Sequence, residues 1–153
     1  MRLKQTICAI AIFTVCATLS PMNSDAADES ENIIKFRKNV MKGIGAHISN
    51  IAAVVKGEVS IMENLLADAQ AISMGLRHVG ILFPEGTDIG KTNALPSVWD
   101  NPSDFQQALS NTQSAAQNMV LAAESNDVNK IGAALGSLGK ACKDCHKDYK
   151  KKK

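Results

Sequence analysis

Two cysteines and a histidine near the end of the chain carry the residue types most able to do chemistry. They stand in the segment Cys142-Lys143-Asp144-Cys145-His146, a C-x-x-C-H spacing. Cysteines at positions i and i+3 lie on one face of a helix about one turn apart, and the next imidazole reaches a metal from the same side. Two such thiols can take the two vinyl groups of one haem while the histidine binds its iron. The motif therefore predicts one covalent haem c per chain.

Other uses of paired cysteines fit the sequence less well. A thioredoxin-like redox pair lies at a helix N-terminus in a βαβ unit, whereas Cys142 and Cys145 are expected near a helix C-terminus. A structural zinc ion needs four well-placed ligands, and no second C-x-x-C exists. Thiol exchange and a simple disulfide stay open as alternatives to haem. With haem attached, we expect no substrate chemistry, so the chain is not expected to be an enzyme.

The N-terminus has the layout of a secretory signal peptide. A basic start precedes an apolar run and then small residues that end at Ala26-Ala27, the pattern of a cleavable export signal. Cleavage after Ala26 would remove residues 1–26, with Cys8 and Cys16, and leave one domain, residues 27–153, in the periplasm. The apolar run is short for a membrane span, and nothing after it resembles one. An uncleaved anchor is the alternative.

The charges of the chain are nearly balanced. It has 17 Lys and Arg against 15 Asp and Glu, a formal net charge of +2. No basic stripe with interleaved aromatic residues occurs, so nucleic acid is not an expected partner. The one run of like charge, Lys150 to Lys153, is typical of a solvated tail, with docking as the alternative.

Four amphipathic segments predict an all-α fold. In each segment, apolar residues recur at steps of three and four, which indicates a helix with one buried stripe. No run of alternating strand residues occurs. The sequence thus predicts an antiparallel four-helix bundle that holds the haem covalently. The expected helices run from Glu31 to Lys56, from Ser60 to before Pro84, from Pro102 or Ser103 to about Ala123, and from Val128 to Tyr149.

The breaks between these segments carry typical turn residues. Gly57 is expected to close the first helix, Ser60 and Glu63 to form a capping box on the second, and Asn126 or Asp127 to cap the last.

One connection is much longer than the others. Residues 84–102 are rich in proline, glycine and asparagine, which predicts an irregular crossover, and loops of this length often cover a site. Trp99, the only tryptophan, is expected to anchor this loop on the bundle.

Met41 is expected to meet the far side of a haem that is held by His146. If the first and last helices are antiparallel neighbours, the start of one lies beside the end of the other. Met41 lies about ten residues into the first helix, roughly 15 Å along its axis, and His146 lies in the final turns of the last. Methionine is also a common core filler, as we expect of Met62, Met74 and Met119.

Arg37 lies one turn before Met41 on roughly the same face. Its guanidinium could pair with a haem propionate, and the alternative is an exposed charge. His47 and His78 have no C-x-x-C partner and no clear register with the iron, so we expect them to be solvated or to lie at the edge of the core.

With these motifs, the chain resembles the class II c-type cytochromes, the cytochrome c′ family and its low-spin relatives, which carry C-x-x-C-H near the C-terminus. The resemblance covers essentially the whole region after the signal peptide. It rests on FRKNVMKGIGAH (36–47), VVKGE (54–58), LFPEGTDIG (82–90), PSVWDNPSDF (96–105) and CKDCHKDYKKKK (142–153).

The resemblance implies a role for each residue of the site. It implies thioether bonds through Cys142 and Cys145, His146 as the proximal iron ligand, Met41 at the distal position and Arg37 beside a propionate. Five-coordinate members often have a non-ligating residue at the distal position, low-spin members have methionine, and a few five-coordinate members keep an unbonded methionine. An arginine is frequent in gas-binding members where Lys150 stands here, which slightly weakens the gas-binding case. Dimers through the first two helices are also implied.

We therefore expect a periplasmic electron carrier, closest to the low-spin members, with His146 and Met41 as axial ligands. Two protein ligands keep the iron six-coordinate in both oxidation states, so little reorganises when an electron moves. Lys143 and Lys147 would favour weak, salt-sensitive encounters with an acidic redox partner protein. The alternative is a five-coordinate protein that binds nitric oxide or carbon monoxide at an open distal site.

Overall fold

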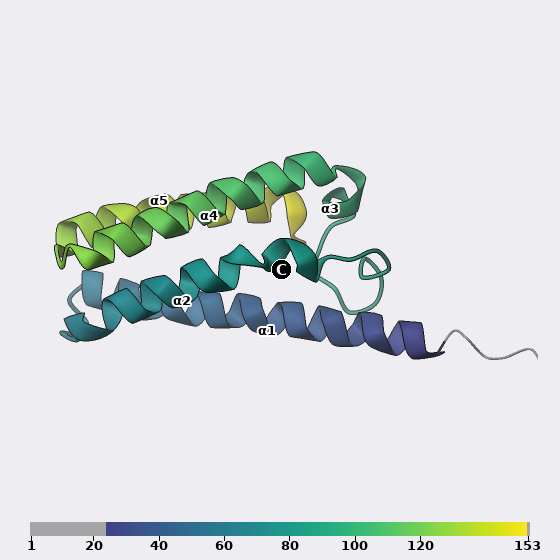
Figure 1. Cartoon of the computed structure of the whole chain (residues 1–153), viewed down its shortest axis with the longest axis horizontal. Coiled ribbons are helices and arrows are strands. Elements are labelled where there is room, and N and C mark those ends of the chain that lie inside the picture. The colour runs from purple at the N-terminus through teal and green to yellow at the C-terminus, as the bar shows by residue number, and fades with distance from the viewer. Residues whose placement is uncertain (1–23, 153) are drawn as a thin grey trace, which may run out of the picture.

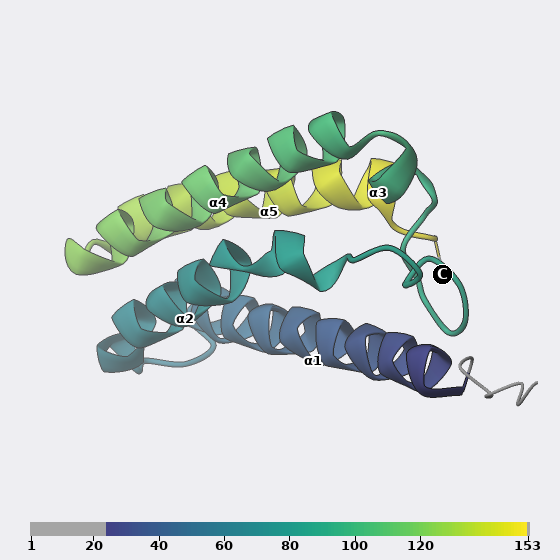
Figure 2. The same ribbon diagram turned by 45° about the vertical axis from the view of Figure 1, so that its right-hand side comes forward.

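The computed structural model describes residues 24–152 and confirms the all-α four-helix bundle. Helices α1 and α2 form one pair, α4 and α5 form a second, and the pairs pack against each other (Figures 1 and 2). The elements are α1 (Ser24–Val55), η1 (Met62–Asn64), α2 (Leu65–Arg77), η2 (Val79–Leu82), α3 (Ser97–Asp100), α4 (Pro102–Glu124) and α5 (Val128–Tyr149).

The predicted signal peptide, with Cys8 and Cys16, lies outside the described residues except for its last three positions, which begin α1. None of the helices between residues 24 and 152 combines the length and the apolar character needed to cross a bilayer.

The first helix begins earlier than expected. The apolar stripe starts near Ile34, which is why the sequence predicts a start at Glu31, but α1 already begins at Ser24. Residues 24–33 contain no proline or glycine that would interrupt a helix, so α1 extends beyond the apolar stripe. The other end agrees with the prediction, because Gly57 leaves the helix with a φ of 74°, a left-handed conformation that favours glycine.

The predicted capping box on the second helix is wrong. Ser60 and Ile61 are not helical, and the chain enters α2 through the 3₁₀ turn η1, whose N-cap Ile61 makes no side-chain cap. Asn64, at the N-cap of α2, donates its side-chain amide to Asp68 Oδ2 at 2.9 Å. The side chain of Asn64 is thus bonded to Asp68 and does not cap the helix backbone. Helix α2 begins at Leu65, five residues after the predicted start at Ser60.

The second pair of helices follows the prediction closely. Helix α4 begins at Pro102, a residue whose fixed φ suits the first helical position. Asn126 has a φ of 52°, and the side chain of Asp127 caps α5 by accepting from the backbone amides of Asn129 and Lys130.

The core lies along the axis of the bundle. Apolar side chains from all four long helices are buried together, and several are completely inaccessible to solvent. Met74 is the exception to the expected pattern, because it is 60% exposed on the outer side of α2 and is not a core filler. The largest fully buried side chains are Ile51, Ile72, Met119, Ile131, Leu138 and Thr87.

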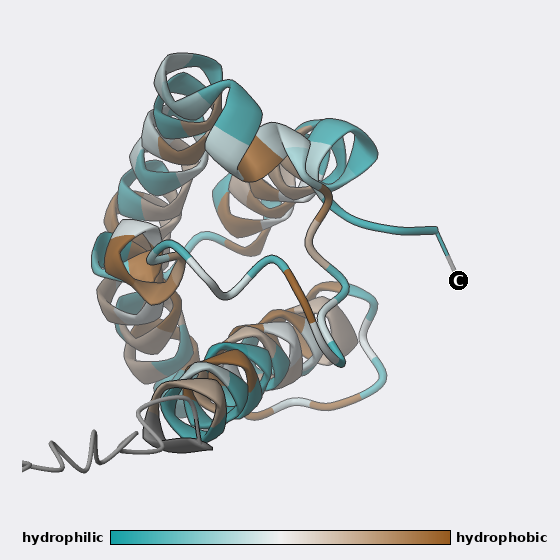
Figure 3. Cartoon of the chain, turned by 90° about the vertical axis from the view of Figure 1, so that its right-hand side faces the viewer, coloured by the Kyte–Doolittle hydropathy of each residue, from teal (hydrophilic) through white to brown (hydrophobic). Residues whose placement is uncertain are grey.

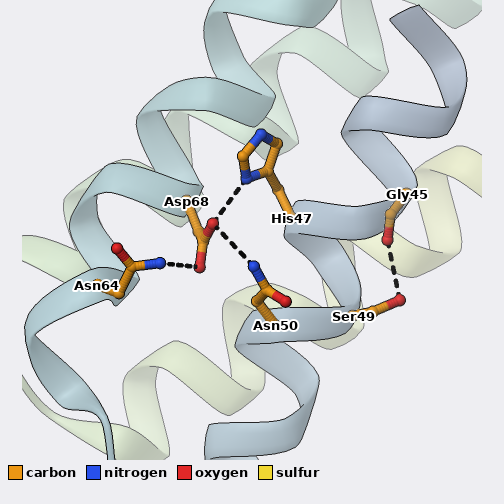
Figure 4. A network of polar contacts seen from close by, with 6 residues as sticks. All are labelled: Gly45, His47, Ser49, Asn50, Asn64 and Asp68. Carbon is orange, nitrogen blue, oxygen red and sulfur yellow. Dashed lines mark hydrogen bonds and ion pairs between the residues drawn. The ribbon is translucent and has the colours of Figure 1, made fainter. Parts of the chain in front are cut away.

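A polar network at the α1–α2 contact was not expected from the sequence. Asp68 is only 3% exposed, and its carboxylate oxygen Oδ1 lies 2.6 Å from Nδ1 of His47 and 3.3 Å from Nδ2 of Asn50 (Figure 4). With the amide of Asn64 on the other oxygen, three side chains from two elements satisfy one buried acid. His47 is therefore a core-edge histidine, as expected, with a specific partner.

The long connection remains mostly irregular. The crossover segment, residues 83–96 between η2 and α3, runs across one end of the bundle (Figure 3). Trp99 anchors it, since its indole Nε1 donates to the carbonyl oxygens of Phe83 at 3.1 Å and Pro84 at 3.2 Å. The segment also meets the chain end through an isolated antiparallel bridge between Ala94 and Lys150.

Candidate haem site

Both cysteines of the motif lie on the inner side of α5 as free thiols. Cys142 is half-buried and packs against the main apolar core, which also receives the side chain of Met41. Cys145, one turn later, packs against a second apolar cluster of Ala94, Val98 and Phe105. The two sulfurs thus face apolar surroundings from neighbouring turns of one helix.

Burial controls the chemistry of these thiols. It raises the pKa of Cys142, and it raises the pKa of Cys145 together with the charges of Cys142 and Asp148. A raised pKa keeps the thiols protonated at neutral pH and makes them poor nucleophiles. This environment suits attachment sites better than a pair that exchanges disulfides.

His146 lies at the exposed edge of the same helix. Its imidazole makes no hydrogen bond with the described residues, so both ring nitrogens are available. Partial desolvation of the ring, followed by the positive charge of Lys150, lowers the pKa of His146. A lowered pKa increases the neutral fraction at pH 7, and only a neutral imidazole can bind a metal ion.

A close helix contact fixes the register between α1 and α5. Gly132 of α5 lies against Val55 of α1, so near that an added Cβ would stand 3.3 Å from Val55 Cγ1. From this contact, Met41 lies fourteen residues back along α1 and His146 lies fourteen residues forward along antiparallel α5. Both are about 21 Å along the axis at about 1.5 Å per residue. Met41 and His146 therefore lie at the same level of the bundle.

The aromatic residues gather at this end of the molecule. Phe83 packs against both apolar clusters, and its ring makes edge contacts with Trp99 and Phe105 at centroid distances of 6.1 and 5.0 Å. Tyr149 continues the row, 5.1 Å from Phe105. These rings form an apolar wall beside Cys145.

Arg37 is 4% exposed, so the alternative of an exposed charge is wrong. Burial lowers the pKa of its guanidinium, and none of the ion pairs among the described residues includes it. Its Nη atoms donate to four oxygens, and its Cζ lies 4.3 Å above the Phe83 ring, a cation–π arrangement. The acceptors are Leu82 O at 2.9 Å, Thr87 Oγ1 and Thr87 O at 3.1 Å each, and Thr92 Oγ1 at 2.7 Å.

The residues present fit a covalently held haem. Helices α1 and α5 contact each other less extensively than the other neighbouring pairs of long helices, and Cys142 of α5 and Met41 of α1 pack against the same apolar core. No group of three or more His, Cys, Asp or Glu side chains able to hold a metal ion by themselves occurs between residues 24 and 152. A site with one free imidazole and two half-buried thiols suits an iron ion that is bound within a haem.

The chain is similar to known proteins over most of its length. A family model described as Cytochrome C' matches residues 32–150. The chain is 32% identical to cytochrome c' of Pararhodospirillum photometricum over 121 residues, which covers 78% of this chain and 97% of that protein. It is 30% identical to cytochrome c' of Rhodospirillum rubrum over 151 residues, covering 98% and 99% of the two chains.

A solved structure gives the same result for the fold. A variant of cytochrome c′ from Alcaligenes xylosoxidans, in complex with nitric oxide, superimposes with a TM-score of 0.75 at 28% identity, covering 81% of this chain and 97% of that one. A bundle with C-x-x-C-H in its last helix defines a class II c-type cytochrome. The chain belongs to the cytochrome c′ family, whose members carry one covalent haem c with its iron.

The structure brings together some of the predicted residues and separates others. Cys142, Cys145, His146 and Met41 share one end of the α1–α5 contact, and Arg37 lies one turn further along α1 with its guanidinium on the crossover segment. The role of each toward haem stays a prediction. Sequence reasoning missed Phe83, Thr87 and Thr92, although the position of the Thr residues in a Pro- and Gly-rich loop was a weak signal that the loop has a fixed conformation.

Proposed function

We propose that this protein binds nitric oxide or carbon monoxide at one haem c, on the side of the iron opposite His146. The observation that carries the proposal is the overall match with a cytochrome c′ that was solved as a nitric oxide complex. This replaces the electron carrier that we expected from the sequence as the leading function. The haem, when bound, supplies the iron that takes the gas.

The residues of the chain would bind, orient and shield the group. Cys142 and Cys145 supply two thioether bonds, and His146 supplies a neutral imidazole from the proximal side. Met41 approaches from α1 at the same level, and Phe83 adds an aromatic surface. Neither side chain can donate a hydrogen bond, so the distal side is apolar and suits a small uncharged gas.

Met41 decides between the two functions, and its replacement is the direct test. If Met41 does not bind the iron, Met41→Leu will leave the ferric and ferrous absorption spectra of the holoprotein high-spin and five-coordinate, as in the wild type. Leucine keeps the apolar volume and removes the sulfur, so packing changes little. A wild-type spectrum that is low-spin, and becomes high-spin in Met41→Leu, would contradict the gas-binding proposal.

Electron transfer is the second candidate, and the register of α1 and α5 favours it. Because Met41 lies at the level of His146, its thioether is the side chain of α1 best placed to become a second axial ligand. In that case the iron would stay six-coordinate in both oxidation states, and the thioether would raise the reduction potential.

Lysines near the site would favour binding of an acidic redox partner protein. Both candidate functions need such a partner, because it sets the oxidation state of the iron. Lys143 and Lys147 lie on the side of α5 that also carries Gly132 and faces α1, as helical spacing requires. Asp144 and Asp148 lie on the other side, lining the groove toward α4. The side of α5 that faces α1 therefore carries positive charges, and the side that faces α4 carries the negative ones.

Salt should therefore weaken oxidation by an anion. We expect the rate with anionic hexacyanoferrate to fall roughly tenfold or more between low ionic strength and 0.5 M salt. Stopped-flow measurement on K143E/K147E should show a slower reaction with less salt dependence. The control K56E/K130E changes two exposed lysines at the far end of α1 and α5 and should behave like the wild type. Equal effects in the two variants would contradict a local docking site.

The remaining parts of the proposal concern location, assembly and reaction type. We propose a periplasmic protein, which the signal-like N-terminus supports, and no reaction beyond gas or electron exchange, because the proposed thioether bonds leave neither cysteine with a free thiol. A homodimer through α1 and α2 would cover apolar side chains that are now exposed on this side. These are Phe36, Met74 and Ile81.

A further inference from the structure

The buried guanidinium of Arg37 binds the crossover segment through hydrogen bonds. All four of its hydrogen bonds reach η2 or residues 87–92, and two of them involve Thr87, itself completely buried. A buried guanidinium whose two Nη atoms donate to four neutral oxygens is costly to release, because these donors would lose their partners away from water. Arg37 therefore ties α1 to the crossover segment.

Thr92 takes part both in the contact with Arg37 and in the turn that leads to Ala94. Its hydroxyl oxygen accepts from Arg37 Nη2 at 2.7 Å and from the backbone amide of Ala94 at 3.0 Å. Thr92 thus fixes the backbone at the position where the crossover segment meets the chain end.

The far end of the crossover segment is bonded to the last turn of α5. The Leu95 amide donates to Tyr149 O at 3.0 Å, and the Lys151 amide donates to Asn93 O at 2.8 Å. The Lys150 amide in turn donates to His146 O at 3.2 Å. Hydrogen bonds therefore run from Arg37 on α1, through Thr92 and the crossover segment, to the backbone of His146.

We propose that Arg37 is a positioning residue that, through Thr92 and the crossover segment, holds the His146 turn of α5 at a fixed distance from α1. The proposal rests on the proposed function only in taking His146 as the iron ligand. Because Met41 projects from α1 and His146 from α5, this distance sets the width of the site. The pairing of Arg37 with a propionate is a different role, since its two Nη atoms are already engaged with the crossover segment.

The test removes the shared hydroxyl and follows amide hydrogen exchange in the holoprotein. Thr92→Val keeps the side-chain shape and removes the acceptor, so exchange at Leu95, Lys150 and Lys151 should accelerate about tenfold while the cores of α2 and α4 stay unchanged. Thr92→Ser should restore slow exchange. The matched control is Thr112→Val in α4, because Thr112 is equally buried and its hydroxyl bonds only to Ala108 O of its own helix.

A second readout distinguishes positioning from a merely structural role. Loosening the His146 turn admits water, which stabilises the more highly charged ferric state, so the reduction potential should fall in Thr92→Val and recover in Thr92→Ser. Arg37→Lys keeps the charge but loses the fork of donors and should give the same local pattern.

Three results would overturn the proposal. One is wild-type exchange at Leu95 and Lys151 in both Thr92→Val and Arg37→Lys. Another is faster exchange spread evenly over α2 and α4 in both variants. The third is local loosening that leaves the Lys150 amide and the potential unchanged. No gas is present in these measurements, so a failure of the gas-binding proposal, read from the Met41→Leu spectra, is distinguishable from a failure of this one.

Discussion

Replacing both Cys142 and Cys145 with alanine will yield an exported protein that loses all of its haem on extraction with acidified organic solvent. The wild type will keep its haem, because two thioether bonds survive conditions that unfold the protein and break the iron–imidazole bond. The change is complete, from one haem per chain to none. Absorbance of the protein fraction after extraction measures it directly.

A neighbour within the motif provides the control. Asp144 stands between the two cysteines, is exposed, and pairs with Lys140 at 2.6 Å on the side of α5 that lines the groove toward α4. Asp144→Ala should keep covalent haem at the wild-type level. Retention of haem by the double cysteine variant would show that the thiols are not the attachment points.

The second large effect is on stability, at the buried carboxylate of Asp68. Asp68→Ala removes the acceptor of three hydrogen bonds, from His47, Asn50 and Asn64, and should lower the free energy of unfolding by about 2–3 kcal/mol. The network joins α1 to the start of α2, so losing the Asp68 carboxylate should first speed amide hydrogen exchange at the start of α2. Urea unfolding followed by circular dichroism measures the change.

Glu63→Ala is the matched control, because Glu63 is an exposed acid in the turn just before α2. It makes no capping box in the structure, so its loss should change the unfolding free energy by less than about 0.5 kcal/mol. A loss of less than about 0.5 kcal/mol in Asp68→Ala as well would mean that the Asp68 network contributes little. A loss of about 2–3 kcal/mol in Glu63→Ala would mean that the capping box forms in solution.

The sequence predicts the bundle well because its main signals are local. Helix periodicity, the left-handed Gly57 and the Asp127 cap are each readable within a few residues. The C-x-x-C-H motif is local too, which is why the attachment residues can be named from the sequence. Errors occur where distant partners take part, as at the start of α2, where Asp68 binds His47 and Asn50 of α1 as well as Asn64.

Long-range contacts are what the sequence could not provide. The acceptors of Arg37 lie 45 to 55 residues away along the chain, so no local pattern distinguishes a buried arginine from an exposed one. The exposure of Met74 follows from the rotation of α2 against its neighbours, which periodicity gives only approximately. The level of Met41 could be predicted, since it needs only helix lengths and an antiparallel pairing.

Intact-mass analysis of the exported, mature protein tests the central claim most directly. The account predicts a single species whose mass equals that of the chain after signal removal plus one haem, with both cysteines unreactive toward a thiol reagent. A mass equal to the polypeptide alone, with two alkylatable thiols, would contradict it.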